Sequence, residues 1–236
     1  MKGLLIKDFK LLKVQKNFFL LILCIAIGIE IFTNSTSSSF IIGFLSFVAT
    51  LFTLSSISYD EFDNGNAFLF SLPITRKSYV IEKYGFGMIL GSSFWAFGTL
   101  IVIFKEVITH KYVSIDTVIG KLKRHVRNKN KVMRIIAAFI ILPIVFAVLA
   151  VMLPFQLKFG GEKGRIAIIC TLVIVFLIGI VITKVANAFN INLSFLFHEI
   201  ATLNSIILIL VIIGITFFML FVSYRTSLSI MKKKEF

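Results

Sequence analysis

Long hydrophobic stretches separated by short polar segments dominate the pattern of this chain. Six such stretches lie at residues 18–32, 40–57, 86–104, 135–153, 166–183 and 205–222. A helix rises about 1.5 Å per residue, so roughly 20 apolar residues cross the hydrocarbon core of a bilayer. The pattern therefore predicts an all-α integral membrane protein, in which six transmembrane helices form one domain over residues 1–236.

The composition agrees with this prediction. Hydrophobic residues make up 58% of the chain and charged residues only 15%. A water-soluble helix carries charge along one face, whereas residues 166–183 contain no charged side chain. These features exclude a soluble globular domain. Gly87 and Gly91, four residues apart in the third stretch, would let a neighbouring helix approach closely.

Lysines at both ends of the chain predict its orientation. The N-terminal segment contains Lys2, Lys7, Lys10, Lys13 and Lys16. The C-terminus carries three more, at 232–234. Positively charged segments stay on the cytoplasmic side, so we expect both termini in the cytoplasm, which requires an even number of spans. Leu5, Phe9 and Leu12 share one helical face, which predicts an N-terminal helix lying in the membrane interface.

One basic segment conflicts with this rule. Residues 105–131 carry eight of the 25 lysine and arginine residues, yet the six-span topology places them outside the cell. Apolar residues recur there at helical spacing: Ile115, Val118, Ile119, Leu122 and Val126. We expect a separate basic amphipathic helix of about a dozen residues. It would lie on lipid headgroups, guard the outer mouth of a translocation path, or attract an anionic surface.

Motifs for catalysis and for metal binding are absent from the sequence. No G-x-x-x-x-G-K-[ST] phosphate loop is present, so the chain lacks that route to ATP hydrolysis. His110, His125 and His198 are not at ligand spacing, and no metal or cofactor site is predicted. The net charge of +14 comes from lysines that flank the spans, so the expected partner is membrane lipid and not nucleic acid.

The polar segment 58–85 has the features of a contact site. It begins with three acidic residues, continues into the apolar residues 67–72, and is interrupted by Pro73. Thr75 is a good N-cap, which predicts a helix that starts at Arg76 and continues into the third hydrophobic stretch.

Two aromatic side chains in this segment, Phe68 and Phe70, are expected to be exposed. Exposed aromatic residues on a polar segment need a cover. They either rest in the membrane interface or fit a groove on a soluble partner.

Three parts of the sequence resemble a known family. The first part contains Glu61, the run Phe-Ser-Leu-Pro-Ile-Thr-Arg-Lys-Ser-Tyr at residues 70–79, and the pair Lys83 and Tyr84. The second part is residues 153–165, and the third is residues 223–236. They are similar to cytoplasmic segments of type-2 ATP-binding-cassette exporter permeases. The resemblance covers essentially the whole chain. Within the family, the chain is most similar to the small permeases of Gram-positive peptide exporters, such as those for phenol-soluble modulins. The long basic loop 105–132 departs from that branch.

The resemblance implies a permease that is driven by another subunit. In that family a separate cytoplasmic ATPase dimer binds ATP and Mg²⁺ and drives two permease subunits. Here the two permease subunits would be either two copies of this chain or this chain and a paralogue. The implied activity is export of amphipathic or apolar substrates, such as peptides, across the plasma membrane of a bacterium. Two alternatives are a membrane-embedded enzyme, which would need a polar catalytic cluster between spans, and a non-transporting protein that gives structural support or immunity.

By the same resemblance, two groups of residues would contact the ATPase. Residues 61–72 would be a coupling segment seated in the ATPase, with Arg76 and Lys77 at its rim. A second contact would follow the fourth span. The candidate residues are Glu61, Phe62, Phe68, Phe70, Leu72, Pro73, Arg76, Lys77, Lys158, Glu162, Lys163 and Arg165.

Overall fold

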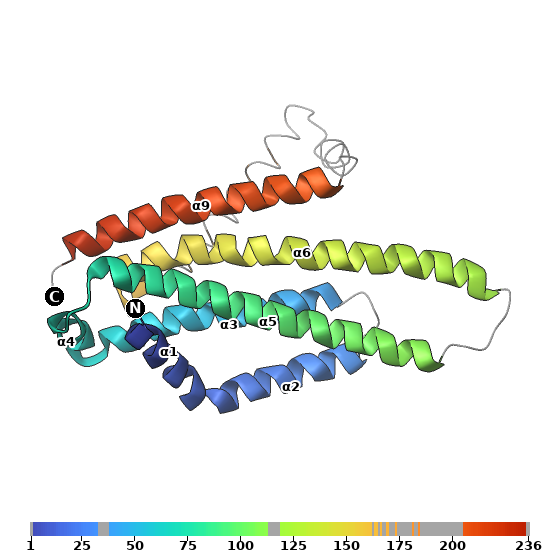
Figure 1. The fold of residues 1–236 in the computed structure, drawn as a ribbon, viewed down its shortest axis with the longest axis horizontal. Coiled ribbons are helices and arrows are strands. Elements are labelled where there is room, and N and C mark those ends of the chain that lie inside the picture. Colours follow the sequence, from blue (N-terminus) through green and yellow to red (C-terminus); the bar gives the residue numbers. More distant parts are fainter. Residues whose placement is uncertain are drawn as a thin grey trace. The chain divides into compact units, whose positions relative to one another are not determined.

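The computed structural model describes residues 2–32, 38–112, 119–161 and 205–234, together with seven single positions between 163 and 184 (Figure 1). For parts of the helices, chiefly 106–112 and 119–137, only the backbone is described. All regular elements in these ranges are helical. In chain order they are α1 (Lys2–Val14), α2 (Lys16–Phe32), α3 (Ser38–Glu61), the 3₁₀ turn η1 (Phe62–Asn64), α4 (Gly65–Ser71), α5 (Arg76–Tyr112), α6 (Ile119–Phe159) and α9 (Ser205–Lys233).

Four of the described helices are long and apolar enough to cross a membrane. Their candidate spans are Ser39–Glu61, Arg76–Lys105, Ala138–Phe159 and Ile209–Lys233, which overlap four of the six predicted stretches. The pair α1 and α2, bent by 63° at Gln15, would count as a fifth if it were one span. With 17 residues, α2 alone is about 25 Å long and falls short of the hydrocarbon thickness. Most of the predicted stretch 166–183 lies outside the described residues.

The chain divides into two compact units, which we describe separately. Unit 1 contains Met1–Ser56 and Ile81–Leu149. Its core includes three aromatic rings from different helices, with Phe52 between Phe19 (centroids 5.2 Å apart) and Phe86 (6.3 Å). Edge-on and tilted ring packing of this kind stabilises the fold beyond the effect of removing the rings from solvent or lipid headgroups.

Two glycines of α5 allow close helix packing in unit 1, as the sequence predicts. A Cβ added at Gly87 would lie 2.9 Å from a terminal methyl of Leu149. One added at Gly91 would lie 3.0 Å from the hydroxyl oxygen of Thr50. The first distance is shorter than real Cβ contacts and the second is at their tight limit, so the absence of a Cβ permits this packing.

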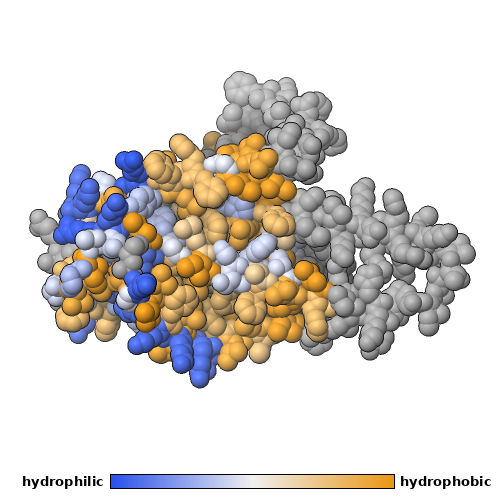
Figure 2. All heavy atoms as spheres, viewed as in Figure 1, coloured by the Kyte–Doolittle hydropathy of each residue, from blue (hydrophilic) through white to orange (hydrophobic). Residues whose placement is uncertain are grey.

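Unit 2 contains Ile57–Val80 and Ala150–Phe236. It holds the last turn of α3, then η1 and α4, the first residues of α5, the end of α6, and α9. In the space-filling view, hydrophobic residues cover most of the visible surface of α9, and hydrophilic residues gather at its C-terminal end (Figure 2).

One local prediction is wrong. Residues 119–126 do not form a separate amphipathic helix, because α6 runs without interruption from Ile119 to Phe159. No glycine or proline lies between Gly120 and Pro143, so nothing in the sequence ends the helix there. Residues 113–118 lie outside the described residues.

The face of α1 that turns toward the protein is not the Leu5, Phe9 and Leu12 face that is predicted to lie in the membrane interface. Its buried residues are Leu4 and Asp8, while Phe9 is exposed. An ion pair of Asp8, described below, decides which face of this helix turns inward.

Candidate functional site

Ionic contacts in unit 2 join the ends of four helices. Lys234, just after α9, places its Nζ 2.7 Å from Oε1 of Glu61 at the end of α3 and 3.1 Å from the carbonyl oxygen of Leu157 in the last turn of α6. Arg76, the first residue of α5, donates from Nη1 to the carbonyl of Lys232, at 2.7 Å. We call these five residues the helix-end junction.

The junction satisfies backbone groups that a helix cannot satisfy itself. The last four carbonyls of a helix have no intrahelical partner and carry the negative end of its dipole. Leu157 and Lys232 supply two such carbonyls, and both accept from a cationic side chain. The contacts therefore fix the ends of α6 and α9 against α3 and α5.

A pair of glycines brings the end of α6 close to α3. Gly160 has φ +81°, a left-handed conformation that ends α6, and a Cβ on it would lie 2.9 Å from Oε2 of Glu61. A Cβ on Gly161 would lie 3.0 Å from the Ser58 side chain. Gln156 adds a hydrogen bond from Nε2 to the Ser58 hydroxyl, at 3.0 Å.

The segment that follows α3 reverses direction and forms the short helix α4. Asp63 adopts a left-handed conformation (φ 52°, ψ 43°), which breaks the helix before Gly65. Asn66 and Leu69 turn inward. The Phe70 ring packs edge-on against Tyr79, with centroids 5.6 Å apart.

The outer side of this segment exposes apolar side chains. Phe62 is 79% exposed, Phe68 71% and Leu72 42%. Exposed apolar side chains of this size need a cover, which is either the membrane interface or a partner protein. We call these three residues the α4 knob.

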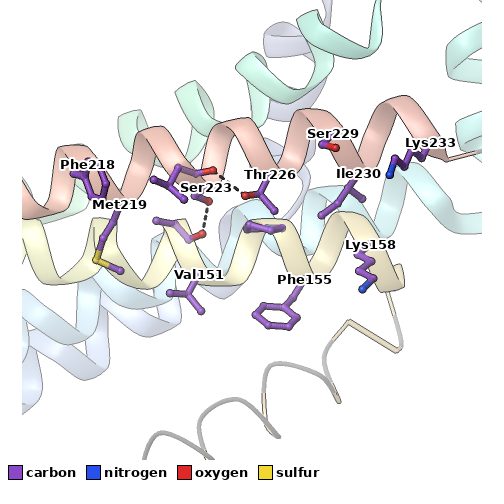
Figure 3. Close-up of a pocket in the computed structure, with 13 residues that line it drawn as sticks. Val151, Phe155, Lys158, Phe218, Met219, Ser223, Thr226, Ser229, Ile230 and Lys233 are labelled. Atoms are coloured by element: carbon purple, nitrogen blue, oxygen red, sulfur yellow. Dashed lines mark hydrogen bonds between the residues drawn. The ribbon is translucent and has the colours of Figure 1, made fainter.

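Helices α6 and α9 line an open groove of about 710 Å³ in unit 2 (Figure 3). Pro154 has no N–H, so the carbonyl of Ala150 loses its helical donor, and the Ser223 hydroxyl of α9 donates to it instead. The groove is otherwise largely apolar, and Lys158 and Lys233 lie at one end of it.

A family model described as ABC-2 family transporter protein matches residues 3–232, which is nearly the whole chain. The chain belongs to the ABC-2 transporter family. This confirms, at the level of the family, the resemblance to type-2 permeases. No curated protein and no solved structure matches the chain. ABC-2 proteins are multi-pass membrane subunits of ABC transporters, are not enzymes themselves, and associate with an ATPase subunit.

The structure of this ABC-2 protein separates the predicted contact residues into two groups. The exposed ones are Phe62, Phe68, Leu72, Pro73, Lys77, Lys158 and Lys163. Glu61 and Arg76 are instead engaged in the helix-end junction. Phe70, which is expected to be exposed, is half-buried, because one side of its ring packs against Tyr79. Glu162 and Arg165 lie outside the described residues.

Sequence reasoning missed a buried ionic cluster in unit 1 of this ABC-2 protein. The Lys83 Nζ lies 2.5 Å from Oδ2 of Asp8 and 3.0 Å from the Ser56 hydroxyl, and both charged side chains are almost fully buried. Glu82 is also buried, with Oε2 3.7 Å from the same lysine. Asp8 shares the inward face of α1 with Leu4, one helical turn earlier, which is the only local signal of its burial.

The cluster does not form a metal site. Within the described part of the chain, no group of three or more His, Cys, Asp or Glu side chains is arranged to hold a metal ion. Its contacts tie α1 to α3 and α5, which is a positioning role.

Proposed function

We propose that the chain is the transmembrane permease subunit of an ATP-driven exporter in the plasma membrane of a bacterium. A separate cytoplasmic ATPase dimer would bind ATP and Mg²⁺ and supply the energy. The observation that carries this proposal is the family match over residues 3–232, together with a sequence that lacks a phosphate loop of its own. Six spans with both termini in the cytoplasm remain the topology that the lysine distribution favours.

The α4 knob is the surface that we propose contacts the ATPase. Phe68 lies on α4, with Phe62 before this helix and Leu72 after it. The helix is held from behind by the Phe70–Tyr79 contact and by the Tyr79 hydroxyl, 3.1 Å from Oδ2 of Asp60. A rigid backing lets a small apolar surface bind without a large cost in conformational entropy. Lys77, Lys158 and Lys163 are exposed and would surround the contact with positive charge.

Movement of the knob would reach the membrane through the helix-end junction. α5 is a single helix from Arg76 to Tyr112, so a displacement of its first turn tilts the whole helix. A second permease subunit, either identical or a paralogue, would complete the path. The described spans carry few charges outside their ends, which favours amphipathic or apolar cargo, such as peptides of the kind moved by phenol-soluble modulin exporters, over ions.

Removal of the knob tests the ATPase contact. In a Phe62→Ala/Phe68→Ala variant, co-purification of the ATPase subunit and export should fall at least about tenfold, because buried aromatic residues dominate interface energies. The matched control is Phe217→Ala, which removes an aromatic ring of similar exposure from α9. Unchanged ATPase binding and export in the double variant would contradict the proposed contact surface.

A further inference from the structure

We infer that the groove between α6 and α9 is a binding site for one anionic phospholipid, with its acyl chains along the apolar wall and its phosphate at Lys158 and Lys233. This goes beyond the proposed transport function and requires only that the chain spans a membrane. The lipid would be a resident ligand and not the cargo.

The groove has the polarity of a phospholipid. Figure 3 shows Phe218 and Met219 at one end and Lys158 and Lys233 at the other, with Phe155 between them along α6. Its volume of about 710 Å³ lies within the range of roughly 300–1,000 Å³ that is typical of small-molecule sites. An apolar wall that ends in two ammonium groups suits an acyl chain that ends in a phosphate.

Two exposed lysines, Lys158 and Lys233, form the cationic end of the groove. Among the described residues, no carboxylate lies within salt-bridge distance of Lys158 or Lys233, and the Lys158 ammonium contacts only the face of the Phe159 ring, 5.0 Å from its centroid. By contrast, the neighbouring Lys234 is neutralised by Glu61. Two exposed ammonium groups at the end of an apolar groove favour an anionic headgroup over a zwitterionic one.

A second copy of the chain fits this groove less well. A two-fold symmetric contact along α9 brings the same surface patch of both copies together. The two lysines of one groove would then approach those of the other, and like charges at an interface are unfavourable. An anionic lipid removes this repulsion.

Lipid titration of the full-length purified chain tests the site. After removal of bound lipid, phosphatidylglycerol and phosphatidylcholine are added separately and bound lipid is counted by native mass spectrometry. Each lysine near an anionic headgroup contributes about fivefold in affinity, so the wild type should prefer phosphatidylglycerol at least about tenfold. Lys158→Gln/Lys233→Gln should abolish the preference. Lys13→Gln/Lys232→Gln, which removes two exposed lysines outside the groove, should keep it.

Three results of the titration overturn the inference. They are equal binding of the two lipids by the wild type, a preference that survives Lys158→Gln/Lys233→Gln, and a preference that is lost equally in the control variant. None of these results depends on the ATPase, so failure here leaves the proposed export function standing.

A fluorescence measurement locates the bound lipid. In a Trp95→Phe background, Phe155→Trp places the single tryptophan in the groove. In nanodiscs that hold one copy, phosphatidylglycerol with brominated acyl chains should quench this tryptophan more than brominated phosphatidylcholine, and the lysine double variant should remove the difference. Equal quenching by both lipids indicates ordinary annular contact and overturns the site. Loss of quenching in discs with two copies assigns the groove to a second chain, which also overturns it.

Discussion

The two units of this permease treat charge and apolar surface in opposite ways. Unit 1 buries a complete ion pair, Asp8 with Lys83, and packs helices against glycines with almost no space between them. The ion pair described in unit 2, Lys234 with Glu61, lies at helix ends and is partly exposed, and this unit leaves an open groove and the α4 knob uncovered. The apolar window of α3 is 61% buried, whereas that of α9 is only 11% buried. We therefore expect unit 1 to hold its shape and unit 2 to provide the surfaces that contact other molecules.

Breaking the buried pair of unit 1 should have the largest effect. Lys83→Met leaves the Asp8 carboxylate buried without its cation, which costs about 3–5 kcal/mol. We expect a large fall in the thermal midpoint of the detergent-solubilised protein, measured by loss of the monodisperse chromatographic peak. Lys7→Met is the matched control, because Lys7 is partly exposed and 3.5 Å from the same carboxylate, and should cost less than about 1 kcal/mol.

A double variant sharpens this test. Asp8→Leu/Lys83→Met removes both charges, so most of the lost stability should return, since a buried ion pair and an apolar pair of similar size are often equivalent. If Lys7→Met destabilised the protein as much as Lys83→Met, the assignment of the pair would be wrong.

The glycine at the end of α6 gives the second largest effect, now in unit 2. Gly160→Ala forces a left-handed conformation on a residue with a Cβ, which should lower the free energy of unfolding by about 1–2 kcal/mol. It also brings that Cβ against the Glu61 carboxylate. The thermal midpoint should fall and the contact of Lys234 with Glu61 should weaken. Gly28→Ala serves as a control, because nothing lies within 4 Å of the added Cβ, and should be neutral or slightly stabilising. Equal stability of the two variants would contradict this role of Gly160.

The smallest effect concerns the hydrogen bond from Ser223 to the carbonyl of Ala150. Ser223→Ala leaves that carbonyl without a donor and should cost about 1 kcal/mol. In a Pro154→Ala background the helix regains its own N–H donor, so the same substitution should then cost almost nothing. A double-mutant cycle on thermal midpoints measures this coupling. A cost of Ser223→Ala that does not depend on residue 154 would show that the proline does not create the need for this bond.

Sequence reasoning succeeded where the signal was local. The N-cap Thr75 predicted the start of α5 at Arg76, and the amide of Ser78 indeed donates to the Thr75 hydroxyl, at 3.1 Å. The spacing of Gly87 and Gly91 predicted close packing, and the structure shows it. Both features depend only on residues within one or two helical turns.

It failed where the deciding partner was far away in the chain. Asp8 and Lys83 are 75 positions apart, and nothing near either residue reveals the pair. The same limit applies to the junction, where Glu61 meets Lys234 across 173 positions. Phe70 is half-buried and not fully exposed, and its contact with Tyr79 could not be read from composition.

The length of α5 has a geometric consequence for the transport step. Its 37 residues form a lever arm of about 55 Å. A rotation of only about 5° at the fulcrum near Arg76 sweeps the opposite end through about 5 Å, the height of one helical turn. In the proposed mechanism, a small rotation of the first turn of α5 by the ATPase would therefore displace the other end of the helix by several ångströms.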